Sequence, residues 1–222
     1  MVEAMRAAGF MTLVLLLLTG LYPLAAFAER LQLGDFSAAD MTGWKAKVFS
    51  GETQYRLEKQ GVISVLKAVS EGAASGMVKE VQVDLTKTPY MNWRWRTDSR
   101  LAGIDEKVKS GDDYVARVYV IVSGGLFFWR TLALNYVWSS NQEKGAAWPN
   151  AYAGDNAMML ALRSGKDARA TWYTEKRNVY EDLQRYFGKQ IQTIDAIAVM
   201  TDTDNSGGQA VTYYGDIYFT SD

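Results

Sequence analysis

Short segments in which hydrophobic and polar residues alternate run from residue 44 to the end of this chain, and stretches rich in Gly, Asn, Asp and Ser separate them. Because successive side chains of a β-strand point to opposite faces of a sheet, this alternation is typical of strands with one buried face. Many short strands with turn residues between them predict an antiparallel β-sandwich. The expected strands are Trp44–Phe49, Gln54–Lys59, Val62–Ala68, Gly76–Val83, Tyr90–Arg96, Tyr114–Val122, Thr131–Trp138, Ala157–Leu162, Ala170–Arg177, Thr193–Met200 and Val211–Phe219.

One short helix is expected among the strands, at Val179–Phe187. Asn178 can cap its first turn, with Glu181 three residues later as the partner in a capping box. Leu183 lies in an apolar stripe at helical spacing, and Gly188 can adopt the left-handed conformation that ends a helix. We expect this helix to cover an open end of the sandwich.

Residues 1–28 have the pattern of a secretory signal peptide. Arg6 lies in a basic region, and Phe10–Leu18 form an apolar run that is too short to span a bilayer. The small residues Ala26 and Ala28 precede a cleavage site before Glu29. These features predict an exported protein, periplasmic or secreted, with no membrane insertion after the signal is removed. Residues 29–222 are long enough for a single β-sandwich domain.

The composition excludes several chemistries. The chain has no Cys and no His, so disulfides, thiol or imidazole catalysis, and metal sites built on these residues are ruled out. Its 24 Lys and Arg balance 25 Asp and Glu, and a net charge of −1 gives no indication of a nucleic-acid partner. Seven Trp and thirteen Tyr favour a thick sheet core or a surface that stacks on flat ligands.

Both ends of the region after residue 28 resemble those of carbohydrate-binding jelly rolls. Leu33-Gly34-Asp35-Phe36 with Gly43-Trp44 is similar to the opening strand of that fold, and Tyr214-Gly215-Asp216-Ile217-Tyr218-Phe219 is similar to its closing strand. The resemblance implies a jelly-roll-like sandwich with a structural Ca²⁺ site that takes one acid from each end, here Asp35 and Asp216. Ordinary turn chemistry is the alternative explanation of these Gly-Asp pairs.

Four further blocks are Gly111–Val120, Asn135–Trp138, Trp172–Val179 and Met200–Asn205. In this order they resemble the family catalogued as domain of unknown function 3047. The resemblance implies a bacterial exported protein and favours the periplasm, but it supplies no activity.

The segment Asp202-Thr203-Asp204-Asn205-Ser206-Gly207 follows the first half of a calcium-binding loop, with oxygen side chains at alternate positions before a Gly. The second half does not follow it, because Tyr213 stands where a Glu is required. Asp202 and Asp204 are therefore alternative Ca²⁺ ligands. The other interpretation is a hairpin turn whose Asp and Asn side chains bond their own backbone, with no cofactor.

Glu175 and Arg177 share one face of an expected strand, and Asn178 follows at the helix cap. All three are candidates for ligand binding. The alternative is an ion pair that fixes this corner between strand and helix.

Polar and aromatic residues around two other strands are also candidates for ligand binding. Asp112 and Asp113 precede the strand of Arg117, which we expect to neutralise one of the acids. Asn135 lies in a later strand, and Trp148 lies in a loop where its ring could face a sugar while amides and carboxylates bond the hydroxyls. Trp148 as a loop anchor that plugs the end of the sandwich is the alternative.

These features favour an exported, non-enzymatic domain that binds carbohydrate or another component of the cell envelope. One alternative is an envelope scaffold that binds another protein. The other is a polysaccharide hydrolase that uses two carboxylates, or a lyase that pairs Tyr with Arg or Lys.

Overall fold

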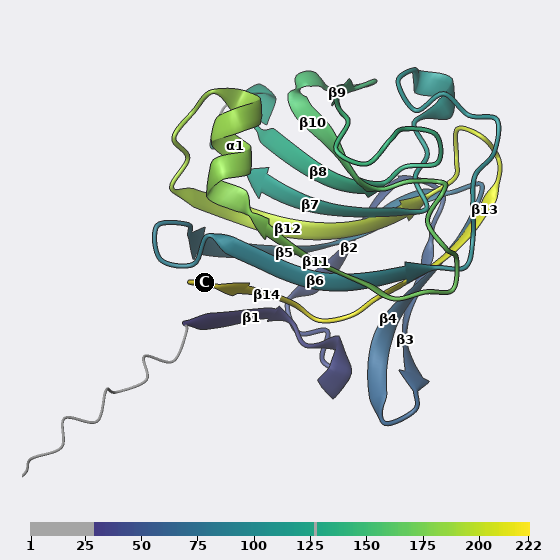
Figure 1. The fold of residues 1–222 in the computed structure, drawn as a ribbon, viewed down its shortest axis with the longest axis horizontal. Helices are drawn as coiled ribbons and strands as arrows, with labels where there is room; N and C mark the ends of the chain where they lie inside the picture. The colour runs from purple at the N-terminus through teal and green to yellow at the C-terminus, as the bar shows by residue number, and fades with distance from the viewer. Residues whose placement is uncertain (1–28, 127) are drawn as a thin grey trace, which may run out of the picture.

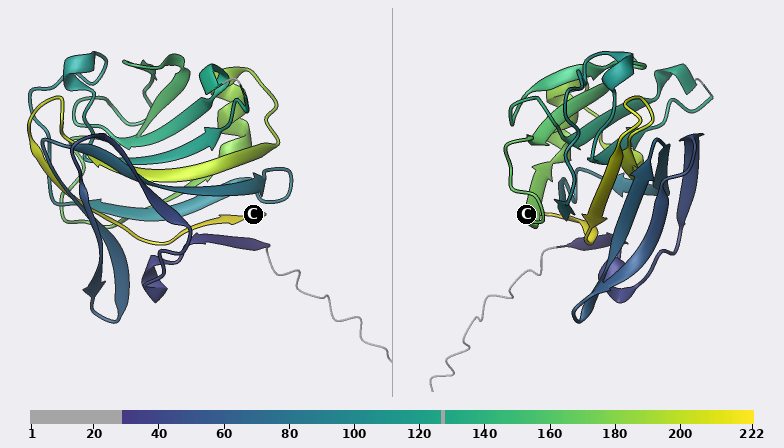
Figure 2. Two further views of the ribbon diagram at one scale, coloured as in Figure 1. Left: turned by 180° about the vertical axis from the view of Figure 1, so that it is seen from behind. Right: turned by 90° about the vertical axis from the view of Figure 1, so that its right-hand side faces the viewer.

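The computed structural model describes residues 29–126 and 128–222, in which two seven-stranded sheets pack face to face (Figure 1, Figure 2). The described residues contain one α-helix and confirm the predicted all-β, jelly-roll-like sandwich. The predicted signal peptide, residues 1–28, lies outside the described residues.

The first sheet runs in the order β1, β14, β6, β13, β4, β3, and β11 pairs with the other side of β6. The first and last strands described lie side by side, with Arg30 opposite Thr220. The hairpin of β3 and β4 extends beyond the rest of the sheet (Figure 2). The strands are β1 (Arg30–Gly34), β3 (Gln54–Gln60), β4 (Ile63–Glu71), β6 (Tyr90–Thr97), β11 (Tyr173–Asn178), β13 (Gln209–Tyr214) and β14 (Ile217–Thr220).

The second sheet runs in the order β2, β5, β12, β7, β8, β10, β9. Its strand pairs are antiparallel within the described ranges, with the exception of β8 and β10, which are parallel. The strands are β2 (Trp44–Ser50), β5 (Ala74–Asp84), β7 (Ala116–Val122), β8 (Leu132–Trp138), β9 (Ala147–Asn150), β10 (Gly154–Arg163) and β12 (Thr193–Asp202).

Aromatic side chains from both sheets meet in the core. Trp93 and Trp95 point inward from β6, as the alternation predicts, and they face Tyr136 and Trp138 of β8. The ring centroids lie 5.2 Å apart for Trp93 and Tyr136, and 6.0 Å apart for Trp95 and Trp138. All four side chains are buried, so the core use predicted for most of the aromatic residues is confirmed here.

The helix α1 (Val179–Phe187) begins and ends where the sequence predicts. Asn178 Oδ1 accepts a hydrogen bond from the Glu181 N–H at 3.2 Å, and Gly188 takes a φ of 64°. Figure 1 shows the helix at one end of the sandwich. Asp182 in its first turn accepts a hydrogen bond from the Tyr136 hydroxyl at 2.8 Å, which ties the helix to the core.

The eleven expected strands are all present, but two further strands and one break were missed. The expected strand Val211–Phe219 is two strands, because the chain turns at Gly215 and Asp216 between β13 and β14. The expected start of β11 at Ala170 is wrong, since Ala170 has a φ of 55° that a strand cannot contain. The missed strands are β1 and β9, and β9 contains a Pro, which only edge strands tolerate.

No helix in the described part of the chain is long and apolar enough to cross a membrane.

Replacing Tyr136 with Phe should lower the free energy of unfolding by about 1.5–3 kcal/mol, because the buried Asp182 carboxylate loses a hydrogen bond. Urea denaturation followed by circular dichroism measures this. The matched control is Tyr186→Phe, which removes a hydroxyl from α1, the helix of Asp182, where the Tyr186 ring lies near Arg185. It should leave the free energy of unfolding unchanged. Equal stability of Tyr136→Phe and the parent chain would show that this contact does not hold the helix.

Candidate ligand-binding cleft

A cleft of about 460 Å³ lies on the outer face of the second sheet, the face that points away from the first sheet. Alternation along β7 produces its floor: Val118 and Val120 point into the core, so Arg117 and Tyr119 point outward. Asn135 of β8 stands opposite Tyr119 in the antiparallel register and adds an amide to the floor.

Three loops and one edge strand form the walls of the cleft. They bring hydrogen-bonding groups beside aromatic rings, which is the composition typical of a binding site for a small polar molecule. The wall residues include Phe49 of β2, Asp112 before β7, Asn150 and Tyr152 around the end of β9, and Asp204 and Asn205 after β12.

The Arg117 guanidinium is held from two sides beneath this cleft. Its side chain is 4 % exposed, and its Nε donates to Asp202 Oδ1 at 2.9 Å while Nη2 donates to Asp202 Oδ2. Nη2 also donates to the Asp112 carbonyl oxygen at 2.6 Å, and Nη1 lies 3.8 Å from the Asp112 carboxylate. The expectation that Arg117 neutralises one of the acids is therefore confirmed, and the two-point contact with Asp202 fixes the guanidinium plane.

The cleft carries more acidic than basic groups. Burial raises the pKa values of Asp202 and Asp112, and the nearby Arg117 opposes that rise. Burial, and then the negative charge of Asp113, raise the pKa of Asp204. Three acids and one arginine line the cleft, so its field favours neutral or cationic molecules.

Asp113 is buried and holds the turn that follows β12. Its carboxylate accepts hydrogen bonds from the N–H groups of Asn205 at 3.1 Å and Ser206 at 2.6 Å. The segment is a turn, as one interpretation predicted, but these two amides are bonded by an acid from a distant loop. Carboxylate oxygens of Asp113, Asp202 and Asp204 lie within 4.8 Å of one another and are of the type that Ca²⁺ prefers. A cation here would compete with Arg117 and with the turn amides, and calcium binding stays a prediction.

The other predicted calcium ligands, Asp35 and Asp216, meet at one serine. Ser37 donates its N–H to Asp216 Oδ1 at 2.8 Å and its hydroxyl to Asp216 Oδ2 at 2.6 Å. The same hydroxyl lies 3.5 Å from Asp35 Oδ1. Both acids thus serve the short 3₁₀ turn at Phe36–Ala38, and a Ca²⁺ role for them also stays a prediction.

Trp148 is not an exposed platform. Its side chain is 4 % exposed, and it stacks on Tyr114 with ring centroids 6.5 Å apart. Val137, Met159 and Ala161 complete this small cluster under β9. The burial agrees with the alternative interpretation of Trp148 as an anchor, but the residue lies in the edge strand β9 and not in a loop that plugs the end of the sandwich.

Glu175, Arg177 and Asn178 lie on β11 of the first sheet and do not line the cleft. Glu175 Oε1 accepts hydrogen bonds from Trp95 Nε1 at 3.0 Å and from Arg163 Nε at 2.6 Å. The two Arg177 contacts with Asp182, at 2.9 Å and 2.5 Å, join β11 to α1. An ion pair does fix the strand-to-helix corner, but it joins Arg177 to Asp182 of the helix, whereas Glu175 pairs with Arg163. Placing these residues with Arg117 in one site is wrong.

The structure brings together Arg117, Asn135 and Asp112 from the predicted set, with Asp113 behind the wall. Sequence reasoning missed Tyr119, Asn150 and other wall residues as parts of the site. Tyr119 could have been found, because it stands two residues after Arg117 and so shares its face of the strand.

Tyr152 supplies the exposed aromatic ring that was expected of Trp148. It is 57 % exposed, yet its hydroxyl donates to the Lys109 carbonyl at 3.2 Å and accepts from Asn205 Nδ2 at 3.0 Å. The ring therefore has a fixed orientation at the rim of the cleft, although it lies in a loop.

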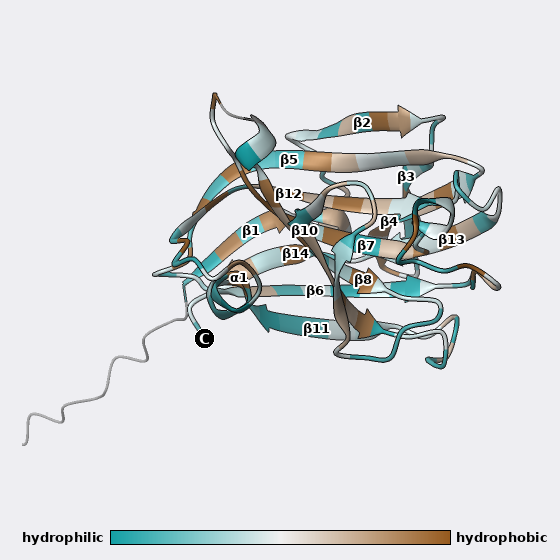
Figure 3. Ribbon diagram, turned by 90° about the horizontal axis from the view of Figure 1, so that it is seen from above, coloured by the Kyte–Doolittle hydropathy of each residue, from teal (hydrophilic) through white to brown (hydrophobic). Residues whose placement is uncertain are grey.

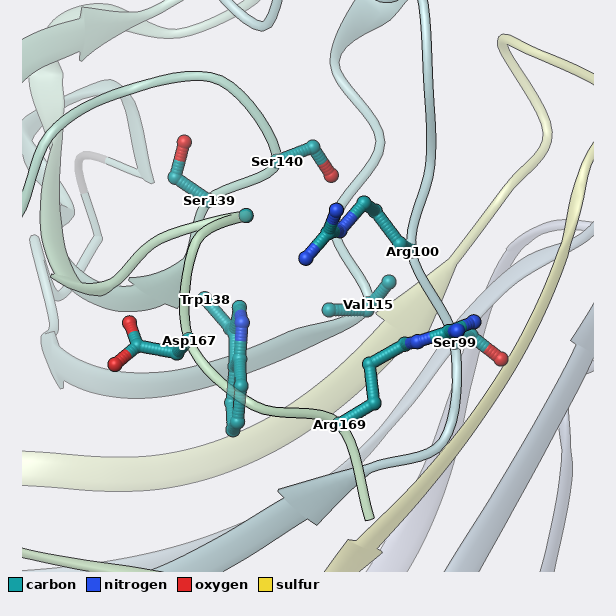
Figure 4. A pocket seen from close by; sticks show the side chains of 9 residues that line it. Ser99, Arg100, Val115, Trp138, Ser139, Ser140, Asp167 and Arg169 are labelled. Atoms are coloured by element: carbon teal, nitrogen blue, oxygen red, sulfur yellow. The ribbon is translucent and has the colours of Figure 1, made fainter. Parts of the chain in front are cut away.

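A second pocket, of about 10 Å³, lies between the loops after β6, β8 and β10. Figure 4 shows the Arg100 side chain extending toward Ser140, with the Trp138 ring and Arg169 on the other side. This volume holds about one water molecule, so the pocket is too small for an organic ligand.

The family model described as "Protein of unknown function (DUF3047)" matches residues 42–218. The chain belongs to this family. No curated protein matches the DUF3047 chain.

Similar solved structures of this DUF3047 chain include the family 11 carbohydrate-binding module from Clostridium thermocellum, at 10 % identity over 88 % of this chain and 96 % of that one, with a TM-score of 0.48. A thermostable cellulase derived from Cel12A of Rhodothermus marinus is 10 % identical over 86 % of this chain and 100 % of its own, with a TM-score of 0.47. Cellulose induced protein Cip1 is 12 % identical over 85 % and 96 %, with a TM-score of 0.46. At these values the likeness says nothing of what this chain binds.

Replacing Arg117 with Met should lower the free energy of unfolding by about 3–5 kcal/mol, because Asp202 is left as a buried charge without its partner. Chemical denaturation at neutral pH measures the change. Lys45→Met, which also removes a positive charge from the outer face of this sheet but at an exposed position, should change it little. A loss below 1 kcal/mol in Arg117→Met would contradict the assigned role.

Glu106 is another buried acid, beside the start of the loop after β8. Its carboxylate accepts hydrogen bonds from the Ser139 hydroxyl and, at 2.5 Å, from the Ser140 N–H. Burial raises the pKa of Glu106 from 4.5 to about 7, against these two hydrogen bonds. The folded state therefore holds a proton that the unfolded chain loses between these pH values.

Raising the pH from 4.5 to above 7 should therefore destabilise the parent chain relative to Glu106→Gln, by up to about 3 kcal/mol. Below pH 4.5 Glu106 carries a proton in both states, and the difference between the two proteins should no longer change with pH. Urea unfolding across this range measures the difference. Glu143→Gln, at an exposed acid paired with Lys166, is the control. A difference that stays constant with pH would refute the burial effect.

Proposed function

We propose that this chain is an exported, non-enzymatic protein of the cell envelope that binds carbohydrate in the cleft above Arg117. The observation that carries the proposal is the cleft itself, of about 460 Å³, in which aromatic rings stand beside amide, carboxylate and guanidinium groups. Its volume lies within the range of small-molecule sites. A neutral sugar suits the excess of acidic groups better than an anionic one.

The wall groups match the two kinds of surface that a sugar ring presents. Its C–H faces can pack on an aromatic ring such as Tyr152, which two hydrogen bonds hold in place at the rim. Its hydroxyls can donate to the side-chain oxygen of Asn135, whose Nδ2 is held by the Ala133 and Met158 carbonyl oxygens at 3.2 Å and 3.3 Å. Pre-orientation of both groups lowers the entropy that binding must overcome.

The pairing of the carboxylates favours binding over hydrolysis. A glycosidase needs one carboxyl group free to donate a proton and a second free to attack or to activate water. In the cleft, Asp202 is bound by Arg117, and Asp112 is bound by Asn150 and Arg117. Asp204 is the one remaining acid of the described lining, and a single carboxyl group does not supply both roles. These contacts suit acids that position neighbouring groups.

A thermal denaturation series tests the proposal with the purified protein and neutral oligosaccharides of glucose, mannose, xylose and N-acetylglucosamine. A sugar at 100-fold its Kd should add about 2.7 kcal/mol, which is a rise of roughly 5–10 °C in Tm. Tyr152→Ala should abolish this rise, whereas Tyr186→Ala on α1 should keep it. Parallel series with Ca²⁺ and with a chelator address the predicted calcium sites.

Three results would count against the proposal. No shift with any sugar would favour a protein-binding scaffold, and an unchanged shift in Tyr152→Ala would move the site elsewhere. Release of reducing ends, or of an unsaturated product that absorbs ultraviolet light, would replace binding with hydrolysis or elimination.

A further inference from the structure

The outer face of the first sheet carries an excess of basic side chains. Residues that stand opposite one another on neighbouring strands point to the same face of the sheet. Arg96, Tyr213 and Lys67 stand opposite one another in this way, and their side chains point to the outer face. Two acids of these strands, Glu58 and Glu71, share the face. The basic residues are Arg30, Arg56, Lys67, Arg94, Arg96 and Lys176.

Part of this set forms a straight row across four strands. Arg56 of β3 stands opposite Lys67 of β4, Lys67 stands opposite Tyr213 of β13, and Tyr213 stands opposite Arg96 of β6. Neighbouring strands are about 4.8 Å apart, so the row is roughly 14 Å long. A row of this kind suits an extended chain that lies across the strands.

Most of these cations lie against aromatic rings. Arg96 and Lys67 lie 4.8 Å and 5.4 Å from the centroid of the same ring, Tyr213. Arg94 lies 4.8 Å from the Trp172 ring, and Lys176 lies 4.7 Å from the Tyr90 ring. Cation–π contacts hold a long side chain in place without neutralising its charge.

The position of Arg94 depends on a glycine in the neighbouring strand connection. A Cβ atom on Gly215 would overlap the side chain of Arg94 at its Cγ and Nε atoms. Gly215 also donates its N–H to the Arg94 carbonyl at 2.9 Å. The Arg94 side chain therefore occupies the space beside Gly215 that the Cβ atom of any other residue would fill.

The cations of this face differ in how far acids neutralise them. Asp98 binds Arg96 at 2.8 Å, and Glu58 lies 3.0 Å from Lys67 and 3.3 Å from Arg56. Arg94 and Lys176 make no ion pair within the described residues. Arg30 makes no ion pair there either, but its guanidinium donates to Gln32 Oε1 at 3.1 Å and 2.7 Å. Arg94 and Lys176 are therefore the two cations of this set that have neither an ion pair nor a side-chain hydrogen bond within the described residues.

We propose that this face binds a linear anionic polysaccharide, a polymer of uronic acids. The Arg94 guanidinium can form two-point hydrogen bonds with one carboxylate, and a regular polymer presents a further carboxylate to Lys176 on the paired strand β11. The face is hydrophilic along β11 (Figure 3). Among the exposed large hydrophobic residues of the described ranges, Val62 at the β3–β4 turn is the one that adjoins this face. The face therefore offers little apolar surface for insertion into a lipid bilayer. Rings covered by cations also offer few free faces for nucleic-acid bases.

This surface is independent of the cleft. The cleft lies on the outer face of the opposite sheet and carries an excess of acids, so the two faces select ligands of different charge. Failure of one proposal leaves the other standing.

Binding of polygalacturonate to the purified protein, measured by isothermal titration calorimetry at low and at physiological ionic strength, tests the inference. The affinity should fall as salt rises, because the contacts are ionic. The double variant Arg94→Gln, Lys176→Gln should bind about tenfold or more weakly, through loss of two charge-assisted contacts. Lys45→Gln, Lys47→Gln removes the same charge from the second sheet and should bind within about twofold of the parent chain.

Arg94→Lys separates the charge from the shape of the group. It keeps the cation and loses the planar fork, so its affinity should lie between those of the parent chain and the double variant. Circular dichroism melts confirm that each variant is folded, and the neutral-sugar shift in the cleft should persist in the double variant.

The inference fails if polygalacturonate does not bind, or if the two double variants lose affinity equally. It also fails if single-stranded oligothymidine or phosphatidylglycerol vesicles bind as tightly as polygalacturonate and lose as much affinity in the Arg94 and Lys176 variant. That result would assign the face to polyanions in general.

Discussion

The buried contact between Arg117 and Asp202 is the interaction on which the organisation of the cleft depends. Removing two charges from water is costly, and the contact is stable only because the guanidinium finds further acceptors on Asp112. These acceptors belong to the segment before β7, so the ion pair joins that segment to the end of β12. Asp113 strengthens the same junction from the neighbouring position, through the turn amides. The loops around the cleft are thus positioned by electrostatics more than by apolar contacts.

The two outer faces of the sandwich differ in charge although the whole chain is nearly neutral. Alternation sends every second side chain of each strand into a shared aromatic core, and the remaining residues are free to specialise. On the first sheet they are cations stacked on rings, and on the second they surround a cleft with acids at its walls. Average composition does not show such a division, because it counts all residues together wherever they lie in the fold.

The sequence predicted the fold well wherever local chemistry decides it. The helix at Val179–Phe187 has its own cap and its own glycine stop, and the strand of Trp93 and Trp95 has a clear alternation. It predicted the site less well, because a site depends on which strands become neighbours. Trp148 has a surface-like context in the sequence but is covered by its neighbours in the fold. Glu175 and Arg117 looked equally suited to ligand binding until the topology placed them on different sheets.

The pairing of β1 with β14 has a consequence for the order in which the fold can form. These are the first and last strands described, and the bond between Ser221 N–H and Glu29 O beside their ladder joins residues 192 positions apart. A chain that emerges from a pore with its N-terminus first cannot complete the first sheet until nearly all of it has emerged. Its earliest strand therefore has no partner in the first sheet until the end of the chain is available, which makes this ladder one of the last parts of the fold to form.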